Sequence, residues 1–599
     1  MKFYLKIILN FLVSIAIFSC SKDEGETPSP STESIPLPQG QSDLRVKEVF
    51  TDSMIVQWDS VENAQTYELS LNDDILSTTE SLIYTVKDLS PATAYTIGLM
   101  PLNSEGGKGK QENISATTLK KEVRIEESTV LLNPFITAPL AALVRIGGED
   151  LSPEAVETIK VKVAGKSNED VTINGTMYPQ TDEFKTHFFD ITADKKFNQT
   201  IISDKDSIEI PVLGLYADYN NTVEYEVETN THIYKGTASI ETDPIGKFYD
   251  HRLTIEVKTA KPDKMEPGEV TWNSGLGHFH HFMFDHRGEL RLVIKKGRSD
   301  LRILRNGNLL IRPLYGINFN EYSLLGEELR VWNVPSGFRH HHDIYEMPSG
   351  NFLVAVDRQA PRKEGYNTVE DCVLELDRET GQIRNYWDLF ELMDIKNLKA
   401  VWQERNRPYD WFHLNSFWYD EIKDEIIVSG RYGGMLKLSR NGENGKKVNT
   451  NKEIIWFMPR FGQYEAHKDH SATKDYILTA VNASGDAYSD QSIHHEDFHW
   501  PDQQHNPSII PSDDGLLHFL IFNNFYDDDR SAIVEYAVDE AANTVKQVWQ
   551  YGKHRPELHS HSRSGATWLP ITNNRMMITQ RSTSPSVEVT VAGEVVFEY

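Results

Sequence analysis

The sequence is poor in cysteine and in basic residues, and each shortage narrows what the protein can be. Cys20 and Cys372 are the two cysteines among 599 residues, so no disulfide can form within the chain if Cys20 carries a lipid. Cys372 lies in a strand-like stretch, where a buried thiol is expected rather than a nucleophile. Lys and Arg number 61 against 89 Asp and Glu, which gives a net charge of −28. We therefore expect no nucleic-acid partner, because such binding needs clustered basic residues.

The amino-terminal segment has the pattern of an export signal. Two lysines precede an apolar run at residues 7–18, which is short for a membrane span and suits the core of a signal peptide. Ser19 and Cys20 follow the run in a sequence that resembles a bacterial lipobox, and residues 21–24 resemble the acidic export tag of surface lipoproteins. We expect a lipoprotein signal peptide at 1–20 and a flexible tether at 21–40. The protein would then be an outer-membrane lipoprotein facing the periplasm or the cell surface; a plain secretory signal is the alternative.

The composition favours β structure. The chain contains 26 Phe, 25 Tyr and 11 Trp, residue types that are enriched in strands. Residues 41–119 contain short alternating strands around Trp58 and Tyr67, and they resemble a fibronectin type III module, which usually acts as a spacer. Residues 120–261 form a second β-rich unit, because several of its segments alternate with the strand period of two.

Residues 262–599 contain a repeat. Turn-then-strand units recur at blade-sized intervals, with turns near Asn306, Gly350, Asp424, Asp475, Gly515 and Asn574. This repeat predicts a β-propeller, most simply with six blades, and a large irregular β-sandwich is the alternative. The expected fold class is therefore all-β, a six-bladed β-propeller preceded by two β-sandwich domains.

Three short histidine-bearing motifs precede strand-like runs within this repeat. They occupy residues 339–343, 410–416 and 504–507, roughly 70 to 90 residues apart, too far for one helix or one hairpin. Residues placed the same way before successive blades can meet at the axis of a propeller. We predict that these histidines and Arg431 converge on one anionic substrate.

Two chemistries fit such a cluster. Three neutral imidazoles can bind zinc or manganese, or one can act as nucleophile in the transfer of an anionic group. Arg431 favours group transfer, because a fixed cation is unfavourable beside a metal dication and its planar fork matches sulfate or phosphate oxygens. Trp411 and Tyr432, with Tyr409 and Phe412, are candidates to pack an aryl ring, although such side chains are more often core residues.

Several motifs together resemble the bacterial arylsulfate sulfotransferases. The resemblance covers about residues 120–599, and residues 214–218 resemble part of the amino-terminal β-sandwich of that family. The stretches that carry it are His342-Asp343-Ile344, Asp410-Trp411-Phe412-His413-Leu414-Asn415-Ser416, Ile427-Val428-Ser429-Gly430-Arg431, Gln504-His505-Asn506-Pro507, Val548-Trp549-Gln550-Tyr551-Gly552 and Glu588-Val589-Thr590-Val591-Ala592-Gly593-Glu594.

The resemblance implies transfer of a sulfuryl group from a phenolic sulfate ester to a phenol, by a ping-pong route through a sulfated histidine and without a cofactor or metal. It makes His505 the nucleophile. His342, His413 and Arg431 would bind the sulfuryl oxygens, with His413 also a candidate proton shuttle, and Asn415 would orient the ester oxygen. The triple histidine leaves open whether His341 or His342 faces the substrate.

Two other functions stay open on the residues alone. One is a metal-dependent propeller lyase or hydrolase acting on polysaccharide, and the other is a non-catalytic surface protein that binds glycans. An insertion ahead of His505 adds a further group that would either shape the mouth of the pocket or form a plain surface loop. Its members are His494, His495, His499 and Trp500.

Overall fold

The computed structural model divides the chain into two compact units, Met1–Lys120 and Lys121–Tyr599. The predicted signal peptide, Cys20 and most of the predicted tether lie outside the described residues. No helix of the described part is long and apolar enough to cross a membrane. The structure describes residues 35–149, 151–152, 155–166, 173–174, 207–244, 255–267, 270–272, 281–295, 299–313, 315–360, 368–394, 410–440, 454–527, 529–579 and 584–599.

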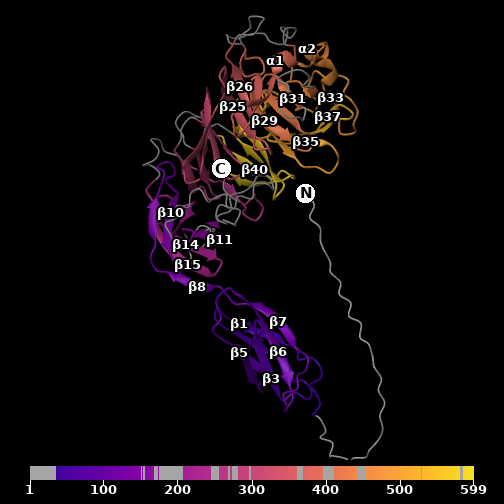
Figure 1. Cartoon of the computed structure of the whole chain (residues 1–599). Helices are drawn as coiled ribbons and strands as arrows, with labels where there is room; N and C mark the ends of the chain where they lie inside the picture. The colour runs from indigo at the N-terminus through magenta and orange to yellow at the C-terminus, as the bar shows by residue number, and fades with distance from the viewer. Residues whose placement is uncertain are drawn as a thin grey trace, which may run out of the picture. The chain divides into compact units, whose positions relative to one another are not determined.

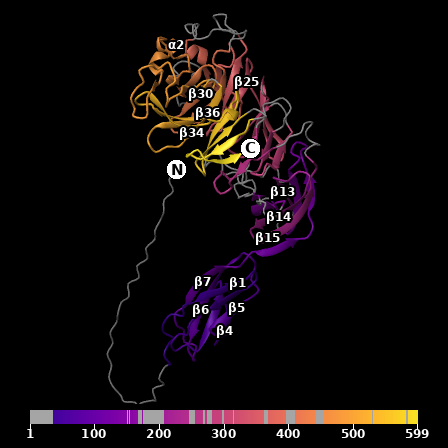
Figure 2. The same cartoon turned by 180° about the vertical axis from the view of Figure 1, so that it is seen from behind.

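The first unit consists of two antiparallel sheets that share one core (Figures 1 and 2). Trp58 is 2% exposed and packs on Tyr67 with ring centroids 5.5 Å apart. The Tyr67 hydroxyl accepts a hydrogen bond from the backbone of Val61 at 2.9 Å. The sheets are β1–β2–β5, formed by Arg45–Val49, Met54–Gln57 and Ile83–Val86, and β4–β3–β6–β7, formed by Asp74–Thr79, Thr66–Leu71, Ala94–Leu102 and Glu112–Thr117.

The second unit begins with two sheets whose facing side chains also form one core. Alternate residues of its strands are buried, as at Val223, Tyr225 and Val227, which is the period that the sequence predicts. One sheet is β13–β10–β9, formed by Ser207–Val212, Ala142–Gly147 and Thr129–Leu132. The other is β12–β11–β14–β15–β8, formed by Ile173–Asn174, Val156–Val163, Asn220–Thr229, His232–Glu241 and Lys121–Ile125.

Six further sheets follow in the described part of the chain (Figure 1). The first two are β17–β18–β19 (Val270–Trp272, His281–Phe284, Leu290–Ile294) and β20–β21–β23–β24 (Ser299–Ile303, Leu309–Pro313, Asn318–Tyr322, Glu328–Asn333). The next two are β22–β25–β26–β27–β28 (Tyr315–Gly316, Phe338–Glu346, Phe352–Arg358, Cys372–Leu376, Ile383–Asp388) and β29–β30–β31–β32 (Leu414–Asp420, Glu425–Gly430, Gly434–Ser439, Ile454–Met458). The last two are β33–β37–β36–β35–β34 (Thr479–Ala480, Thr544–Tyr551, Arg530–Asp539, Leu517–Asp527, His505–Ile510) and β16–β41–β40–β39–β38 (Thr259–Ala260, Val595–Glu598, Val587–Val589, Asn574–Ile578, Gly565–Leu569).

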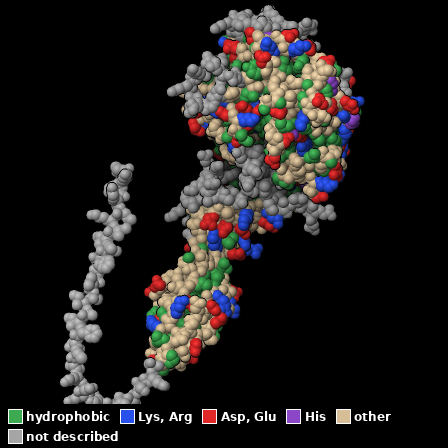
Figure 3. Space-filling model, turned by 90° about the vertical axis from the view of Figure 1, so that its right-hand side faces the viewer, with side chains coloured by type: hydrophobic (Ala, Val, Ile, Leu, Met, Phe, Trp, Pro, Cys, Tyr) green, Lys and Arg blue, Asp and Glu red, His purple; other side chains and the backbone are tan. Residues whose placement is uncertain are grey.

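Helical structure is limited to four short segments in the described residues. They are the α-helices α1 (Leu389–Leu392) and α2 (Tyr464–Lys468) and the 3₁₀ turns η3 (Lys474–Tyr476) and η4 (Pro556–Leu558). The prediction of an all-β chain is thus confirmed. Acidic and basic side chains are interspersed over the face drawn in Figure 3, an arrangement that favours solubility.

Most predicted turn-then-strand units are present, and one is wrong. Left-handed residues occupy the turns before β21, β26, β30, β35 and β39, namely Gly307, Gly350, Asp424, Gly515 and Asn573. The unit predicted at residues 474–478 is instead η3 followed by the short strand β33, which pairs parallel with β37. The sheet β17–β18–β19, whose turn contains Gly288, was not among the predicted units.

Candidate active site

Four strands from four different sheets, β25, β29, β34 and β38, contact one another in that order. Asp343 in β25 accepts a hydrogen bond from the backbone N–H of Phe417 in β29 at 3.0 Å. Ser416 in β29 accepts one from the backbone N–H of Asn506 in β34 at 3.1 Å. The polar residues beside the motif histidines therefore tie the three motifs together.

The backbone of the three motifs is irregular. Each contains a shift in strand register, between His340 and Ile344, between Leu414 and Ser416, and between His505 and Ser508. Such irregularities redirect side chains and are common beside active sites. Left-handed backbone at non-glycine residues costs energy and gathers at functional sites. In this region it occurs at His342, Glu370, His413, Gln503, Asn506, Arg563 and Ser564.

His505, the first residue of β34, is held through both ring nitrogens. Its Nδ1 lies 2.7 Å from Asn524 Oδ1 and 3.0 Å from the Gln503 carbonyl. Its Nε2 accepts a hydrogen bond from the backbone N–H of Arg563 at 3.2 Å. Burial lowers the pKa of His505 to about 3. The imidazole is therefore neutral at physiological pH.

His413, in the loop before β29, has the opposite protonation. Its Nδ1 lies 2.6 Å from Asp410 Oδ2 and 2.8 Å from Glu370 Oε2. Burial by itself lowers the pKa of this imidazole, but the hydrogen bonds and negative charges of Asp410 and Glu370 outweigh burial and raise the pKa of His413 to about 9. His413 is thus an imidazolium at neutral pH and can donate a proton.

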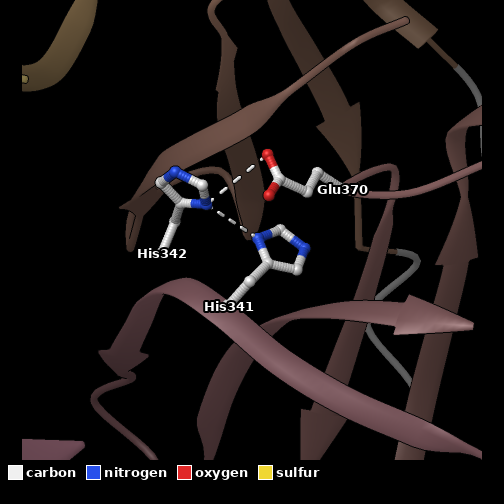
Figure 4. A group of neighbouring side chains, drawn as sticks. All are labelled: His341, His342 and Glu370. Atoms are coloured by element: carbon white, nitrogen blue, oxygen red, sulfur yellow. Dashed lines mark hydrogen bonds and ion pairs between the residues drawn. The ribbon is translucent and has the colours of Figure 1, made fainter. Parts of the chain in front are cut away.

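His341 and His342 lie beside Glu370 (Figure 4). Their Nδ1 atoms are 3.1 Å apart, and His342 Nδ1 is 3.7 Å from Glu370 Oε2. The ring centroids of His342 and His413 are 4.8 Å apart, whereas the side chain of His341 is fully buried behind them. Burial lowers the pKa of His342 to about 3 and that of His341 well below its ordinary value. His342 is the one of the two that reaches His413.

Arg431 follows β30 and faces the same loops. Its Nε and Nη2 donate to Gln503 Oε1 at 3.0 and 2.7 Å, and Nη2 donates to the carbonyl of His561 at 3.3 Å. The guanidinium lies over the Tyr432 ring at 5.2 Å, and that ring is also 5.2 Å from the ring of His413. Arg431 and His413 both lower the pKa of His505 through their charge. The structure therefore brings His505, His413, His342, Arg431 and Tyr432 together.

Two glycines bring the Arg431 turn close to the His413 loop. The backbone N–H of Arg431 donates to the carbonyl of His413 at 2.9 Å. A Cβ atom at Gly430 would lie 2.4 Å from Phe412, and one at Gly433 would lie 2.0 Å from it. Phe412 is fully buried, so its ring fills the space that a larger residue would need. The buried ring of Phe412 thus explains why glycine occupies both ends of the Gly-Arg-Tyr-Gly sequence.

Gly433→Ala is expected to lower the free energy of unfolding by about 1–3 kcal/mol, the usual effect of overpacking a filled core. Denaturant unfolding monitored by tryptophan fluorescence measures this change. The double variant Phe412→Leu with Gly433→Ala should recover part of the loss, because leucine vacates the space under the turn. Equal stability of Gly433→Ala and the parent protein would contradict this packing.

Two predicted substrate-binding residues have structural contacts. Trp411 is 6% exposed in the hydrophobic core, where its indole N–H donates to Asp371 at 2.8 Å. Asn415 donates to the carbonyl of Gln504 at 2.7 Å, so its amide holds the segment that precedes His505. Tyr409 lies outside the described residues.

The insertion before His505 is packed through stacked rings. His494 lies between Phe461 and His499, with centroid distances of 3.8 and 4.7 Å, and His499 stacks on Tyr526 at 3.9 Å. His495 stacks on Tyr488 at 3.8 Å, and Trp500 is 1% exposed. The group is thus packed against Phe461, Tyr488 and Tyr526, and a role at the mouth of the pocket stays a prediction.

Several residues at the site were missed by the sequence analysis. Glu370 and Asn524 contact the two key histidines, and the buried Arg312 of β21 lowers the pKa of His341 and His342 through its charge. As single polar residues outside any motif, they give no sequence signal. The loop at residues 559–564 does have a sequence signal, because His559 and His561 precede β38 as the other histidines precede their strands.

Two groups of side chains in the described part could hold a metal ion. They are His341, His342 and Glu370 (Figure 4), and Glu370, Asp410 and His413; the ligand atoms of each group lie within 4.8 Å of one another. Imidazole and carboxylate ligands suit zinc. The 3.1 Å between the two Nδ1 atoms of the first group is compatible with a shared metal ion about 2.1 Å from each nitrogen.

Comparison with known proteins adds two domain matches. Residues 254–591 match the family model described as arylsulfotransferase (ASST), and residues 129–243 match the arylsulfotransferase Ig-like domain. Arylsulfate sulfotransferase AssT from Escherichia coli O6:H1 is 25% identical, over 71% of this chain and 80% of that protein. Arylsulfate sulfotransferase AssT from Lelliottia amnigena is 23% identical over the same shares. The crystal structure of FN3tt is matched over 14% of this chain and 91% of its own, at 26% identity and a TM-score of 0.13.

Proposed function

The chain belongs to the arylsulfotransferase family, and we therefore propose that it moves a sulfuryl group from a phenolic sulfate ester to a phenol through a sulfated His505. One observation carries the proposal. A neutral imidazole, whose pKa is lowered to about 3, lies close to an imidazolium, whose pKa is raised to about 9. Groups whose pKa values are pushed apart in one site suit the roles of nucleophile and acid.

In the first half-reaction, Nε2 of His505 attacks the sulfur of the ester. The bond between sulfur and the phenolic oxygen breaks, and the proton of His413 passes to that oxygen, so that a neutral phenol leaves. Arg431 binds sulfuryl oxygens, on which charge gathers in the transition state. His505 is left with sulfur on Nε2 and hydrogen on Nδ1, and His413 is left neutral.

In the second half-reaction, the acceptor phenol gives its proton to the neutral His413. The phenolic oxygen then attacks sulfur, and the bond between sulfur and Nε2 breaks. The electron pair returns to Nε2 and His413 is again charged, so the protein is restored. The same acid serves both directions, as reversible exchange between two phenols requires.

Initial rates test the proposal directly. With p-nitrophenyl sulfate as donor and phenol as acceptor, we expect parallel lines in double-reciprocal plots, because the donor product leaves before the acceptor reacts. Intersecting lines would indicate that both substrates bind before transfer, and would contradict the covalent route.

The pH dependence follows from the two histidines. The rate of His505 sulfation should be level across neutral pH and fall above about pH 9, where His413 loses the proton that it donates. Glu370→Gln removes one of the two carboxylates that raise the pKa of His413, so the fall should move about 1–3 pH units lower. Single-turnover rates against pH measure this shift. Glu379→Gln, which alters an exposed carboxylate paired with Arg330, is the control, and an unmoved limb in Glu370→Gln would contradict the assignment.

A metal-dependent lyase or hydrolase acting on polysaccharide is the second candidate, because His341, His342 and Glu370 can converge on one ion. The two functions differ in their response to metal removal. We expect sulfuryl exchange to be unchanged after dialysis against a chelator, measured against undialysed protein. Loss of activity that is restored by zinc would favour the second candidate.

We also propose that the six sheets from β16 to β41 are the blades of a six-bladed propeller. The pairing of β16 with β41, which joins an early strand of this region to its last, supports closure of the ring. Residues 41–119 are proposed to be a fibronectin type III-like spacer, and Cys20 to carry the lipid that anchors the protein in the outer membrane.

A further inference from the structure

Asn524 has an amide whose orientation is fixed by its neighbours. It lies in β35 and is fully buried. Its Nδ2 donates to the carbonyls of Ser560 at 2.8 Å and Arg563 at 3.1 Å. Because carbonyl oxygens can only accept hydrogen bonds, the amide nitrogen must face them. The amide oxygen must therefore face His505 Nδ1, 2.7 Å away.

This orientation determines the tautomer of His505. Asn524 Oδ1 and the Gln503 carbonyl are both acceptors, so Nδ1 carries the hydrogen and Nε2 carries the lone pair. The other side of the ring agrees independently. The backbone N–H of Arg563 can only donate, and it lies 3.2 Å from Nε2. Groups of fixed polarity on both sides thus make Nε2 the nucleophilic nitrogen.

We propose that Asn524 is a positioning residue that keeps Nε2 of His505 nucleophilic and, as a neutral acceptor, keeps the sulfated histidine reactive. This inference rests on the proposed function. Once sulfur is bound to Nε2, the ring with its Nδ1 hydrogen is cationic and is a good leaving group. An amide oxygen does not take that proton, whereas a carboxylate in its place would stabilise the cationic ring or accept the proton, and so strengthen the bond between nitrogen and sulfur.

Among the described residues, no carboxylate hydrogen-bonds to His505 or is one of the main influences on its pKa. The charged or titratable groups that interact with it most are Arg431, His413 and His342, and the backbone of Arg563 bonds to it. Among the described residues these come from the turn after β30, the loop before β29, strand β25 and the loop before β38. The residue at position 524 therefore determines whether Nδ1 of His505 faces a neutral or a negatively charged acceptor.

Asn523 provides a matched control. It is the preceding residue of the same strand and is equally buried. Its Oδ1 accepts from the backbone N–H of Asp502 at 2.9 Å, and its Nδ2 donates to the carbonyl of Trp500 at 3.2 Å. The same substitutions at Asn523 thus disturb a buried amide that holds Trp500 and Asp502, ahead of His505, but that makes no hydrogen bond to the His505 ring.

The experiment measures formation and discharge of the sulfated protein by rapid-quench mass spectrometry, with p-nitrophenyl sulfate as donor and phenol as acceptor. Asn524→Leu should slow sulfation about 10- to 100-fold, by analogy with the cost of removing the partner that orients a metal-bound histidine. Asn524→Asp should discharge about tenfold or more slowly than the parent at pH 9, where a carboxylate is ionised, and the difference should shrink at lower pH. Asn523→Leu and Asn523→Asp should stay within about twofold of the parent.

Parental rates in both Asn524 variants would overturn the inference, as would equal losses in the Asn523 variants. If the parent protein forms no sulfated His505 at all, the proposed function fails instead. Nitrogen-15 NMR of histidine-labelled parent protein is a second test that needs no variant at Asn524. His505, assigned by difference with His505→Gln, should show a lone-pair nitrogen at Nε2, and a hydrogen on Nε2 would overturn the inference.

Discussion

Replacing His505 with glutamine is expected to reduce sulfuryl exchange between p-nitrophenyl sulfate and phenol by about 10⁴-fold or more, a loss typical of removing a covalent nucleophile. His413 is protonated at neutral pH and has no lone pair to offer at its charged ring, and His342 Nδ1 already lies 3.1 Å from His341 Nδ1. Glutamine keeps a buried polar side chain of similar length, so the loss should come from chemistry rather than from unfolding.

His518→Gln is the matched control. His518 lies in β35, whose residues pair with those of β34, and bonds to Glu535 and Asp514 at 2.9 and 3.0 Å. This variant should keep exchange within about twofold of the parent, with a small loss of stability. Retention of more than a tenth of the parental rate in His505→Gln would contradict the role of His505.

His413→Gln should slow the protein by an amount that depends on the leaving group. A general acid matters most when the departing oxygen is basic, and such an acid contributes about 10²–10⁴-fold. We expect a loss near the top of that range for phenyl sulfate, and a loss of about tenfold for p-nitrophenyl sulfate, whose phenolate leaves without a proton. Single-turnover rates for a series of substituted phenyl sulfates measure this dependence.

The series contains its own control. If His413 only bound the sulfuryl oxygens, every ester would lose rate by the same factor, because the oxygens are alike in all of them. A uniform loss would therefore contradict proton donation by His413 and leave it a binding role. The parent protein should show a shallow dependence on phenol acidity, and His413→Gln a steep one.

The strands could be predicted from the sequence because the patterns that indicate a strand are local. Alternation at Val223, Tyr225 and Val227 and turn residues such as Gly350 and Asp424 are readable within a few positions. The same kind of evidence failed at residues 474–478, where a turn-like sequence precedes a 3₁₀ turn and a parallel strand. Local composition does not determine which strand a two-residue strand such as β33 pairs with.

The motif histidines could be named from the sequence, but their charge could not. Burial lowers the pKa of both His505 and His413, but Asp410 of the same motif and Glu370 from outside it raise the pKa of His413. Asn524 likewise lies outside the motifs, in strand β35. Such partners become visible only when the chain is folded, since their effect depends on distance and exclusion of water.

The packing role of Trp411 illustrates the same limit. An aromatic residue beside a predicted site can line a pocket or fill a core, and the sequence offers no distinction between them. The structure buries Trp411 with Phe390 and Phe412, beneath the loop of His413. Its contribution is to hold that loop in place.

Intact-protein and peptide mass spectrometry after incubation with an aryl sulfate, without any acceptor, shows directly whether His505 becomes sulfated. We expect one sulfuryl group per chain, attached to His505, and its disappearance when phenol is added. A chain that stays unmodified while it catalyses exchange, or a sulfuryl group on any other residue, would contradict this expectation.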